Sequence, residues 1–256
     1  MNTKIVCVYH PRAKEVIDPI LIEYPDVFVP LLCNSDNYKM GTSVFFDVMR
    51  KDNEVGNLAM LNRYFCEITG VYWLYKQLSN FHDPDMVGLC HYRRVLDLNY
   101  RNLDPSKIYA KRVSYALPNH LEYVPYNPSF SFRPIIELIL DVFFNTFPEY
   151  SSVREVCKED LKFYDKNMFI MNRDEFVKYF NFIDSCCKVL MNTDVWTNIK
   201  SWYDQGKAYY TREYLFGRQP AYFLEYFTGL YLAKRKIEGC AVESVPMTSS
   251  SFCEKI

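Results

Sequence analysis

The chain has 256 residues, 49% of them apolar and 24% charged, with a formal net charge of −1. This is an ordinary globular composition with enough residues for a sizeable core. The near-neutral charge argues against a nucleic-acid-binding protein. Aromatic residues are frequent, at 17%; they suit core packing and also stacking against sugars or bases.

The first half of the sequence alternates strands and a helix. The β-rich run 5–9 predicts a first strand, and 27–34 predicts a second, in which Pro30 favours an edge or an irregular start. Apolar residues recur every three or four positions over 56–80, which predicts a helix. The apolar run 86–90 predicts the next strand. Strand, helix and strand in this order indicate a βαβ unit in an α/β sheet.

The second half is predicted to be mainly helical. Three prolines in the segment "YVPYNPSFSFRP" make 95–134 a loop-rich region. Amphipathic helices are expected over 134–147, 173–190 and 219–236, and a short buried strand over 167–171. With no repeat and no clear linker, we predict one α/β domain with a helical C-terminal part.

The nine cysteines indicate a reducing compartment. Their number is odd, they include no C-x-x-C pair, and the N-terminal sequence does not resemble a signal peptide. We therefore expect a cytoplasmic protein. No apolar run approaches the roughly 20 residues that a membrane-spanning helix needs.

Several catalytic and cofactor-binding motifs are absent. The sequence contains no G-x-G-x-x-G, no Walker-type phosphate loop, no G-x-S-x-G and no H-E-x-x-H. Its four histidines offer little material for a multi-histidine metal centre. A cysteine-dependent hydrolase would rest on Cys90 with His91, and neighbours on a strand point to opposite faces.

The stretch "HYRR", 91–94, follows the apolar strand directly. Ligands of open α/β sheets bind beyond the carboxyl ends of the strands, and the planar guanidinium of arginine matches phosphate oxygens. If the extended backbone continues, His91 and Arg93 point to one side, and Tyr92 and Arg94 to the other. The alternative is a solvated basic pair at the end of a strand.

The preceding helix carries a second candidate surface. At about 100° per residue, Asn62, Thr69, Trp73 and Lys76 share one flank beside the apolar stripe, and Glu67 lies on the other side. This polar flank could border a cleft. The alternative is the mixed boundary of an ordinary amphipathic helix.

Two segments resemble motifs of a known family. "NRYFCEITGVYWLYK" at 62–76 looks like N-x-x-Y-x-E-L/I-T-x-x-Y-W-x-x-K, and "GLCHYRR" at 88–94 looks like G-L-x-H-Y-R-R. Both mark a bacterial family catalogued as a domain of unknown function and associated with capsule and O-antigen clusters. Its members resemble glycosyltransferases, with galactofuranosyl transfer as an assigned activity. Weaker matches follow the order of the family's other motifs at 55–62, 147–150, 167–171 and 218–232.

The resemblance implies a UDP-sugar-dependent, inverting glycosyltransferase. UDP-galactofuranose would be the donor, and a lipid-linked oligosaccharide of surface polysaccharide synthesis the acceptor. The fold would be a single GT-A-like α/β domain, 1–256, with a central mixed sheet flanked by helices. Residues 1–115 would bind the nucleotide sugar, and residues 116–256 would form the helical acceptor part.

The resemblance also implies a donor site at the strand end. In GT-A-like folds an Asp-x-Asp there holds a metal and the diphosphate; here His91-Tyr92-Arg93 stands in that place. Cationic side chains can neutralise a diphosphate as a metal does. A Mn²⁺ or Mg²⁺ ion stays open, with Asp83, Asp85 or Asp97 as ligands. The expected donor-binding residues are His91, Tyr92, Arg93, Arg94, Asn62, Glu67, Thr69, Trp73, Lys76 and Asn167.

Two carboxylates are candidates for the catalytic base that an inverting transferase needs. Glu225 stands where the family's helix carries its glutamate, and Asp165 precedes the strand that begins at Asn167. Either could instead form a structural ion pair with Arg218 or Lys166.

Other functions stay open at this point. The same fold could serve a non-catalytic carbohydrate-binding or scaffold protein of the same pathway. The helix 219–236 combines aromatic residues with a terminal basic cluster, which suits an anionic membrane surface. The same aromatics at helical spacing also suit a core. The aromatic and basic residues in question are Phe223, Tyr226, Phe227, Leu230, Tyr231, Lys234, Arg235 and Lys236.

Overall fold

The computed structural model describes residues 1–9, 18–32, 50–51, 65–91, 94–116, 133–158, 162–191 and 219–249. The chain forms two compact units, each assembled from separate segments. The first unit comprises Met1–Lys111, Lys166–Phe180 and Cys240–Ile256, and the second comprises Arg112–Asp165 and Asn181–Gly239. The chain therefore leaves the first unit twice and returns to it twice.

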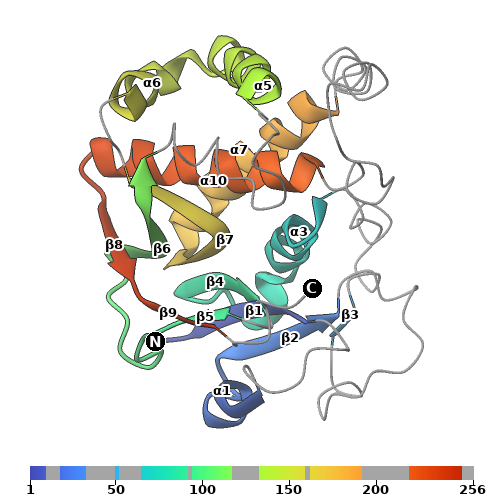
Figure 1. Cartoon of the computed structure of the whole chain (residues 1–256). Helices are drawn as coiled ribbons and strands as arrows, with labels where there is room; N and C mark the ends of the chain where they lie inside the picture. The colour runs from blue at the N-terminus through green and yellow to red at the C-terminus, as the bar shows by residue number, and fades with distance from the viewer. Residues whose placement is uncertain are drawn as a thin grey trace. The chain divides into compact units, whose positions relative to one another are not determined.

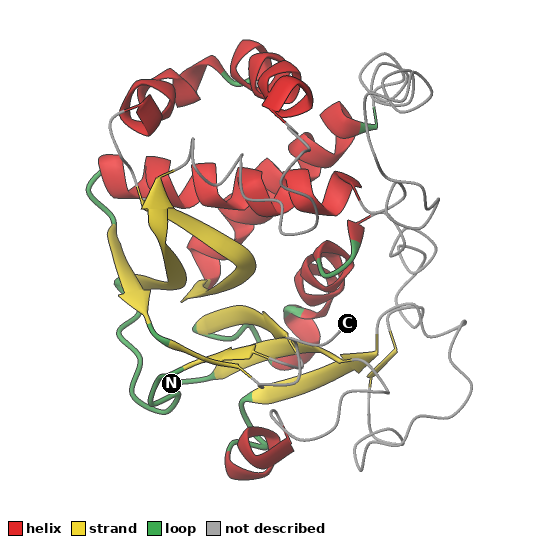
Figure 2. Cartoon of the chain, in the orientation of Figure 1, coloured by secondary structure: helices red, strands yellow, loops and turns green. Residues whose placement is uncertain are grey.

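The described strands form one mixed sheet (Figure 2). The strand order is β3-β2-β1-β4-β7-β6-β8, with β5 added to β4 and β9 added to β5. β1 is parallel to β2 and β4, β2 is parallel to β3, and β7 is antiparallel to β4. The strands are β1 (Thr3–Tyr9), β2 (Phe28–Leu32), β3 (Arg50–Lys51), β4 (Met86–His91), β5 (Arg94–Leu96), β6 (Lys107–Ala116), β7 (Lys162–Asn172), β8 (Ala241–Val245) and β9 (Met247–Ser249).

Pro30 lies inside β2. β2 pairs with β1 along its whole length, whereas the described residues of β3 pair with Leu31 and Leu32. Pro30 therefore precedes the point where the second ladder begins, as expected for a residue without a backbone donor.

Helix α3 (Ile68–Gln77) covers one face of the sheet over β1 and β4 (Figure 1). Its buried residues include Ile68, Val71 and Leu74. Gly70 allows close contact: a Cβ there would lie 3.0 Å from Val8 Cγ2 and 3.3 Å from Leu89 Cδ1. The predicted βαβ unit is thus confirmed. The helix predicted over 56–80 is confirmed over Ile68–Gln77, and 56–64 lies outside the described residues.

The opposite face of the sheet carries the other core of the first unit. Ile5, Cys7, Met86 and Cys90 belong to it. Tyr100 packs edge-on against Phe28, with 4.8 Å between the ring centroids, and its hydroxyl donates to the Leu96 carbonyl. Burial raises the pKa of this tyrosine far above its ordinary value. Helix α1 (Asp18–Glu23), the short helix η5 (Ser79–Phe81) and the first part of α7 (Arg173–Leu190) also belong to this unit.

Strands that were not predicted add to this pattern. The region 95–134, predicted to be loop-rich, also contains most of β5 and all of β6, which is formed by the run "KIYAKRVSYA". The predicted helical C-terminal part is present, and further strands follow it. After α10 (Gln219–Ile237) the chain adds β8 to β6 and β9 to β5 (Figure 1).

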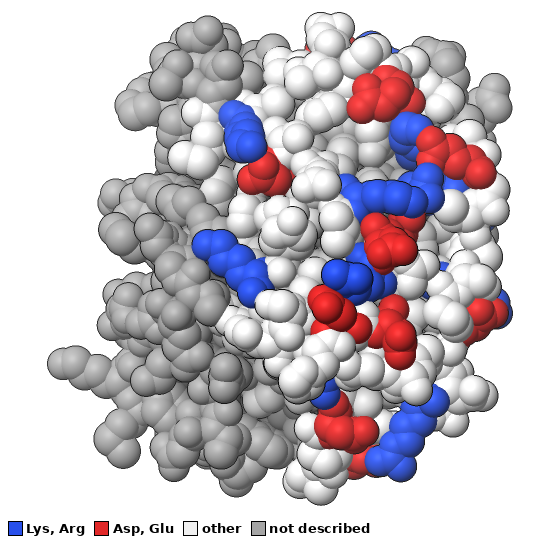
Figure 3. All heavy atoms as spheres, turned by 180° about the vertical axis from the view of Figure 1, so that it is seen from behind, with Lys and Arg blue, Asp and Glu red and all other residues white. Residues whose placement is uncertain are grey.

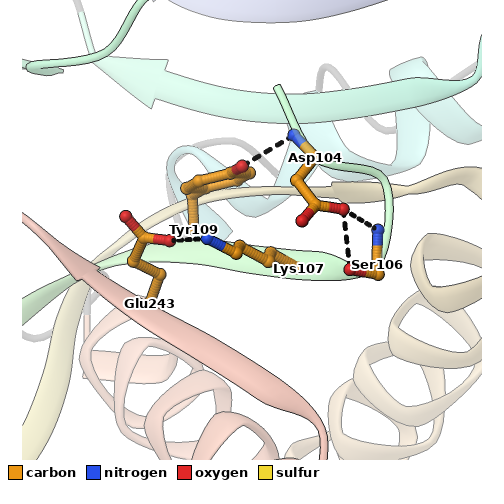
Figure 4. Close-up of polar contacts among 5 residues, drawn as sticks. All are labelled: Asp104, Ser106, Lys107, Tyr109 and Glu243. Carbon is orange, nitrogen blue, oxygen red and sulfur yellow. Dashed lines mark hydrogen bonds and ion pairs between the residues drawn. The ribbon is translucent and has the colours of Figure 1, made fainter. Parts of the chain in front are cut away.

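A set of polar contacts surrounds the start of β6, and we call it the β6–β8 network (Figure 4). Lys107 Nζ donates to Glu243 Oε2 on β8 at 2.9 Å. Ser106 donates from both its backbone nitrogen and its hydroxyl to Asp104 Oδ1, at 2.9 and 2.6 Å. The Asp104 backbone nitrogen donates to the Tyr109 hydroxyl at 2.7 Å. The network joins β8 to β6.

The second unit is mainly helical and is centred on aromatic rings. Phe143 stacks on Phe227 with centroids 4.7 Å apart and meets Tyr150 and Phe182 edge-on. The helices described in it are α5 (Arg133–Thr146), η6 (Pro148–Tyr150), α6 (Ser151–Lys158), the end of α7 (Arg173–Leu190), and α10. The helices predicted at 134–147, 173–190 and 219–236 are confirmed, and α6 was not predicted.

The aromatic stripe of α10 lies in this core. Phe223, Tyr226, Phe227, Leu230 and Tyr231 are each at most 8% exposed. Their side chains are therefore not available to a membrane surface in this structure, which corrects the aromatic half of that prediction. At the end of the helix, Lys234 and Arg235 both pair with Glu238, and Lys236 is exposed. No described helix is long and apolar enough to cross a bilayer.

Candidate functional site

The candidate site lies where β4 ends, in the first unit. β1, β2 and β4 are parallel, so their carboxyl ends meet at one edge of the sheet, where α/β folds bind ligands. His91 is the last residue of β4 and pairs with Arg94 of the antiparallel strand β5. Tyr92 and Arg93 lie outside the described residues.

This pairing changes the predicted arrangement of the basic side chains. We expected a continuing strand that sends His91 and Arg94 to opposite faces. Directly opposed residues of an antiparallel pair instead point to the same face. The chain reverses after His91, so the imidazole and the Arg94 guanidinium share one side of the sheet. Arg94 also pairs with Ser249 of β9, which places the C-terminal strand beside the site.

Glu67, at the N-terminal end of α3, brings three elements together. Its Oε1 lies 3.7 Å from His91 Nε2 and accepts a hydrogen bond from Asn167 Nδ2 at 3.1 Å. The side chains of His91 and Glu67 are 15% and 13% exposed. We call Glu67, His91 and Asn167 the Glu67 cluster; they come from α3, β4 and β7.

Asn167 combines a buried oxygen, unpaired within the part of the chain that the structure describes, with an unusual backbone conformation. It is 1% exposed, and its Oδ1 is buried without a hydrogen-bond partner among the described residues. Its φ is +48°, in the left-handed region that asparagine tolerates better than most residues. The paired positions of β4 and β7 end at Leu89 with Phe169, so Asn167 lies beyond the regular ladder.

The backbone before Glu67 is also left-handed. Cys66 has a φ of +45°, which is costly for a residue other than glycine or asparagine. The turn is held from the helix side: Thr69 donates from its backbone nitrogen and from its hydroxyl to the Cys66 carbonyl, at 3.2 and 2.8 Å. Unusual backbone therefore lies on both sides of the Glu67–Asn167 hydrogen bond.

The rest of the predicted helix flank does not form an open edge. Thr69 and Trp73 are each 2% exposed, and Trp73 packs near Phe81 with ring centroids 5.9 Å apart. Both belong to the core, and we leave them out of the site. Lys76 is exposed, and Asn62 lies outside the described residues.

The two candidate bases both belong to the second unit. Glu225 lies on α10, where it is half-buried and has an interaction partner. Asp165 lies on β7, two residues before Asn167, and its side chain is outside the described part. Glu67 is therefore the carboxylate that the structure shows beside His91.

Other reactive groups are already engaged or buried. Asp83 pairs with Arg173 at 3.1 Å, Asp85 accepts from the Asn2 backbone nitrogen at 2.7 Å, and Asp97 accepts from the Thr248 hydroxyl. Within the described ranges, no three His, Cys, Asp or Glu side chains gather as a metal site would require. Cys90 is 3% exposed in the core, so it is not placed as a hydrolase nucleophile.

The charges on one face of the described surface are mixed. On the face seen in Figure 3, lysine and arginine side chains alternate with aspartate and glutamate. The Glu67 cluster with Arg94 differs from such a surface because it combines an imidazole, a guanidinium and a carboxylate at a strand end. These groups can bind an anion and hydrogen-bond a polyhydroxylated ligand.

Comparison with known proteins gives a family and a fold. A family model described as a domain of unknown function, DUF4422, matches residues 4–219. No curated protein matches the sequence. A solved structure, the apo form of the bifunctional glycosyltransferase WbbM, superimposes with a TM-score of 0.67 at 19% identity. The likeness covers 98% of this chain and 46% of WbbM, so this chain spans about half the length of that protein.

Proposed function

The chain belongs to the DUF4422 family, and on that premise we propose that it is a glycosyltransferase that uses a UDP-sugar as donor. The fold is one that a known glycosyltransferase also has, over nearly the whole of this chain. Fold alone does not define an activity, so the proposal depends on the site.

The observation that carries the proposal is the pairing of His91 with Arg94 at the end of β4. It places a ring nitrogen and a guanidinium on one face of the sheet, where α/β folds bind nucleotides. Charge-assisted hydrogen bonds from such groups stabilise a diphosphate and the charge that develops as it leaves. We assign the diphosphate to His91 and Arg94, together with Tyr92 and Arg93.

The reaction would be transfer with inversion at the anomeric carbon. The acceptor hydroxyl oxygen forms the new bond to that carbon, and the bond to the β-phosphate oxygen breaks. UDP leaves with the electron pair, and a carboxylate takes the acceptor proton. Glu225 and Asp165 stay our candidates for that base. Galactofuranose as the sugar and a lipid-linked oligosaccharide as the acceptor are the finer parts of the proposal.

Two further points complete the proposal. Cations at the strand end would stabilise the diphosphate without a bound metal, so chelation should leave most of the activity intact. Peripheral association with an anionic membrane would rest on the basic end of α10, where Lys236 is exposed. Flotation of the protein with anionic vesicles at low salt tests that association, and neutralising Lys234, Arg235 and Lys236 should abolish it.

The activity is tested by incubating the protein with UDP-galactofuranose and a lipid-linked acceptor and measuring released UDP and elongated product. We expect acceptor-dependent release that Arg94→Ala reduces, whereas Arg101→Ala, an exposed arginine beside Tyr24, does not. Binding of the donor without turnover on any acceptor would favour a non-catalytic carbohydrate-binding protein. Absence of both binding and turnover would overturn the proposal.

A further inference from the structure

The amide of Asn167 has a fixed orientation. Its Nδ2 donates to Glu67 Oε1 at 3.1 Å. The amide nitrogen therefore faces Glu67, and the carbonyl oxygen Oδ1 points elsewhere.

That oxygen has no partner among the described residues although it is buried. A buried polar atom without a hydrogen bond is unfavourable, and the left-handed backbone at the same residue adds to the cost. Thr3 Oγ1 and Trp73 Nε1 are also buried without a partner. Those two lie in a regular strand and a regular helix, whereas Asn167 combines the unpaired oxygen with strain.

The position and chemistry of this atom indicate its partner. Oδ1 is an acceptor only, so it suits a hydroxyl and not a phosphate oxygen. Asn167 contacts Glu67, and Glu67 in turn lies beside His91, which we assign to the diphosphate. We propose that Asn167 Oδ1 accepts a hydrogen bond from a hydroxyl of the donor's sugar. This inference rests on the proposed function and names Asn167 as a residue that selects the sugar.

Glu67 is then a positioning residue. It acts through Asn167, by holding the amide nitrogen, and touches neither the sugar nor the phosphate in this account. Glu67→Gln keeps an oxygen that can accept from Asn167 Nδ2, whereas Glu67→Leu removes it at similar size. We therefore expect Glu67→Gln to retain most of the sugar selectivity and Glu67→Leu to lose it.

The experiment compares binding of UDP and UDP-galactofuranose by calorimetry in the wild type and in Asn167→Gly. Glycine adopts a positive φ without strain, so this variant removes the amide and preserves the backbone. We expect UDP affinity to stay within about twofold and UDP-galactofuranose affinity to fall about tenfold, the effect of one lost hydrogen bond. A set of donors, each with one sugar hydroxyl replaced by fluorine, should contain one that the wild type binds more weakly and Asn167→Gly does not.

Several results would overturn this inference while leaving the proposed function intact. They are equal loss of affinity for UDP and UDP-galactofuranose in Asn167→Gly, unchanged affinity for both, or a wild type that binds every fluorinated donor normally. Melting temperatures identify a variant that fails to fold. In that case Asn167→Ser, whose hydroxyl is too short to replace the amide oxygen, is measured with the same donors and the same expectations. A wild type that binds neither UDP nor the donor would instead refute the proposed function.

Discussion

Two polar clusters of the first unit differ in how well their atoms are satisfied. In the β6–β8 network the hydrogen bonds are short and direct, and the backbone around them is ordinary (Figure 4). In the Glu67 cluster one amide oxygen is buried without a partner, and left-handed residues occur at Cys66 and Asn167. The first cluster has the satisfied hydrogen bonds that stability of the fold alone would favour. The second keeps unfavourable features that a ligand would relieve, and for this reason we assign function to it.

The electrostatics of the network agree with a structural role. The hydrogen bond from Ser106 lowers the pKa of Asp104, and the hydrogen bond to Glu243 raises the pKa of Lys107. Both shifts favour the charged forms that are present near neutral pH. Since these groups are exposed, solvent screens them strongly and they contribute little to stability.

Replacing the α3 indole should give the largest effect. Trp73→Ala removes a side chain that is 2% exposed, and such truncations cost about 3–5 kcal/mol. We expect a large fall in the melting temperature, measured by circular dichroism. A normal melting temperature with lost activity would show that Trp73 belongs to the site. The distinction between the core residues of α3 and the site at its N-terminal end would then be weaker.

Removing the guanidinium at the strand end should affect binding and not folding. Arg94→Ala is expected to weaken UDP binding by about 1.5–3 kcal/mol, the contribution of a hydrogen bond to a charged group. The melting temperature should change little because the side chain is only partly buried. Lys107→Ala is the matched control, because it removes a cation from the β6–β8 network. If both variants bind UDP equally well, the two clusters do not differ as we propose.

The contact between β4 and β7 should be sensitive to a single methyl group. A Cβ at Gly88 would lie 2.7 Å from the Phe169 carbonyl oxygen and 2.8 Å from Ile170 Cγ1. Gly88→Ala must therefore displace β7, at a cost of about 1–3 kcal/mol for overpacking. We expect a lower melting temperature and weaker donor binding together, since β7 carries Asn167.

A glycine with free space around it provides the control for that variant. A Cβ at Gly239 would meet no atom within 4 Å, although its φ is +88°. Asparagine tolerates positive φ, so Gly239→Asn should change stability less than Gly88→Ala does. Equal effects in chemical denaturation would show that crowding between β4 and β7 is not the cause.

The smallest effect is expected in the β6–β8 network. Lys107→Met should leave the melting temperature nearly unchanged at neutral pH. Because the pKa of Lys107 is raised in the folded state, its contribution is fully present below the ordinary lysine pKa. It is lost as the pH rises through the folded-state value. Wild type and variant should therefore converge at strongly alkaline pH; a difference that grows there would contradict the ion pair with Glu243.

The sequence predicted those parts of the fold that depend on local patterns. The β-rich run at 5–9 and the amphipathic helices at 173–190 and 219–236 are clear examples. Periodicity could not show whether the aromatic stripe of α10 faces a core or a membrane, because both environments favour the same residues. It also could not show that β8 and β9 return to the first unit, since strand pairing across distant segments is not a local property.

The candidate site was predicted in composition but not in geometry. The strand end at His91 followed from the apolar run before it, and the diphosphate role of Arg94 stays a proposal. Their shared face follows from the antiparallel pairing of β4 with β5. The contact of Glu67 with Asn167 joins positions 100 residues apart. No periodic pattern reveals such a contact, or the left-handed backbone that accompanies it.

Hydrogen–deuterium exchange with and without UDP tests the central claim most directly, because it compares both clusters in one protein. The account predicts slower exchange at the end of β4 and the start of β5, within 86–96, with no change over 104–109 and 241–245. A smaller decrease in exchange is expected at 65–70, because bound UDP would affect this segment only indirectly, through the contact of His91 with Glu67. Protection of the β6–β8 network with none at the end of β4 would contradict the account.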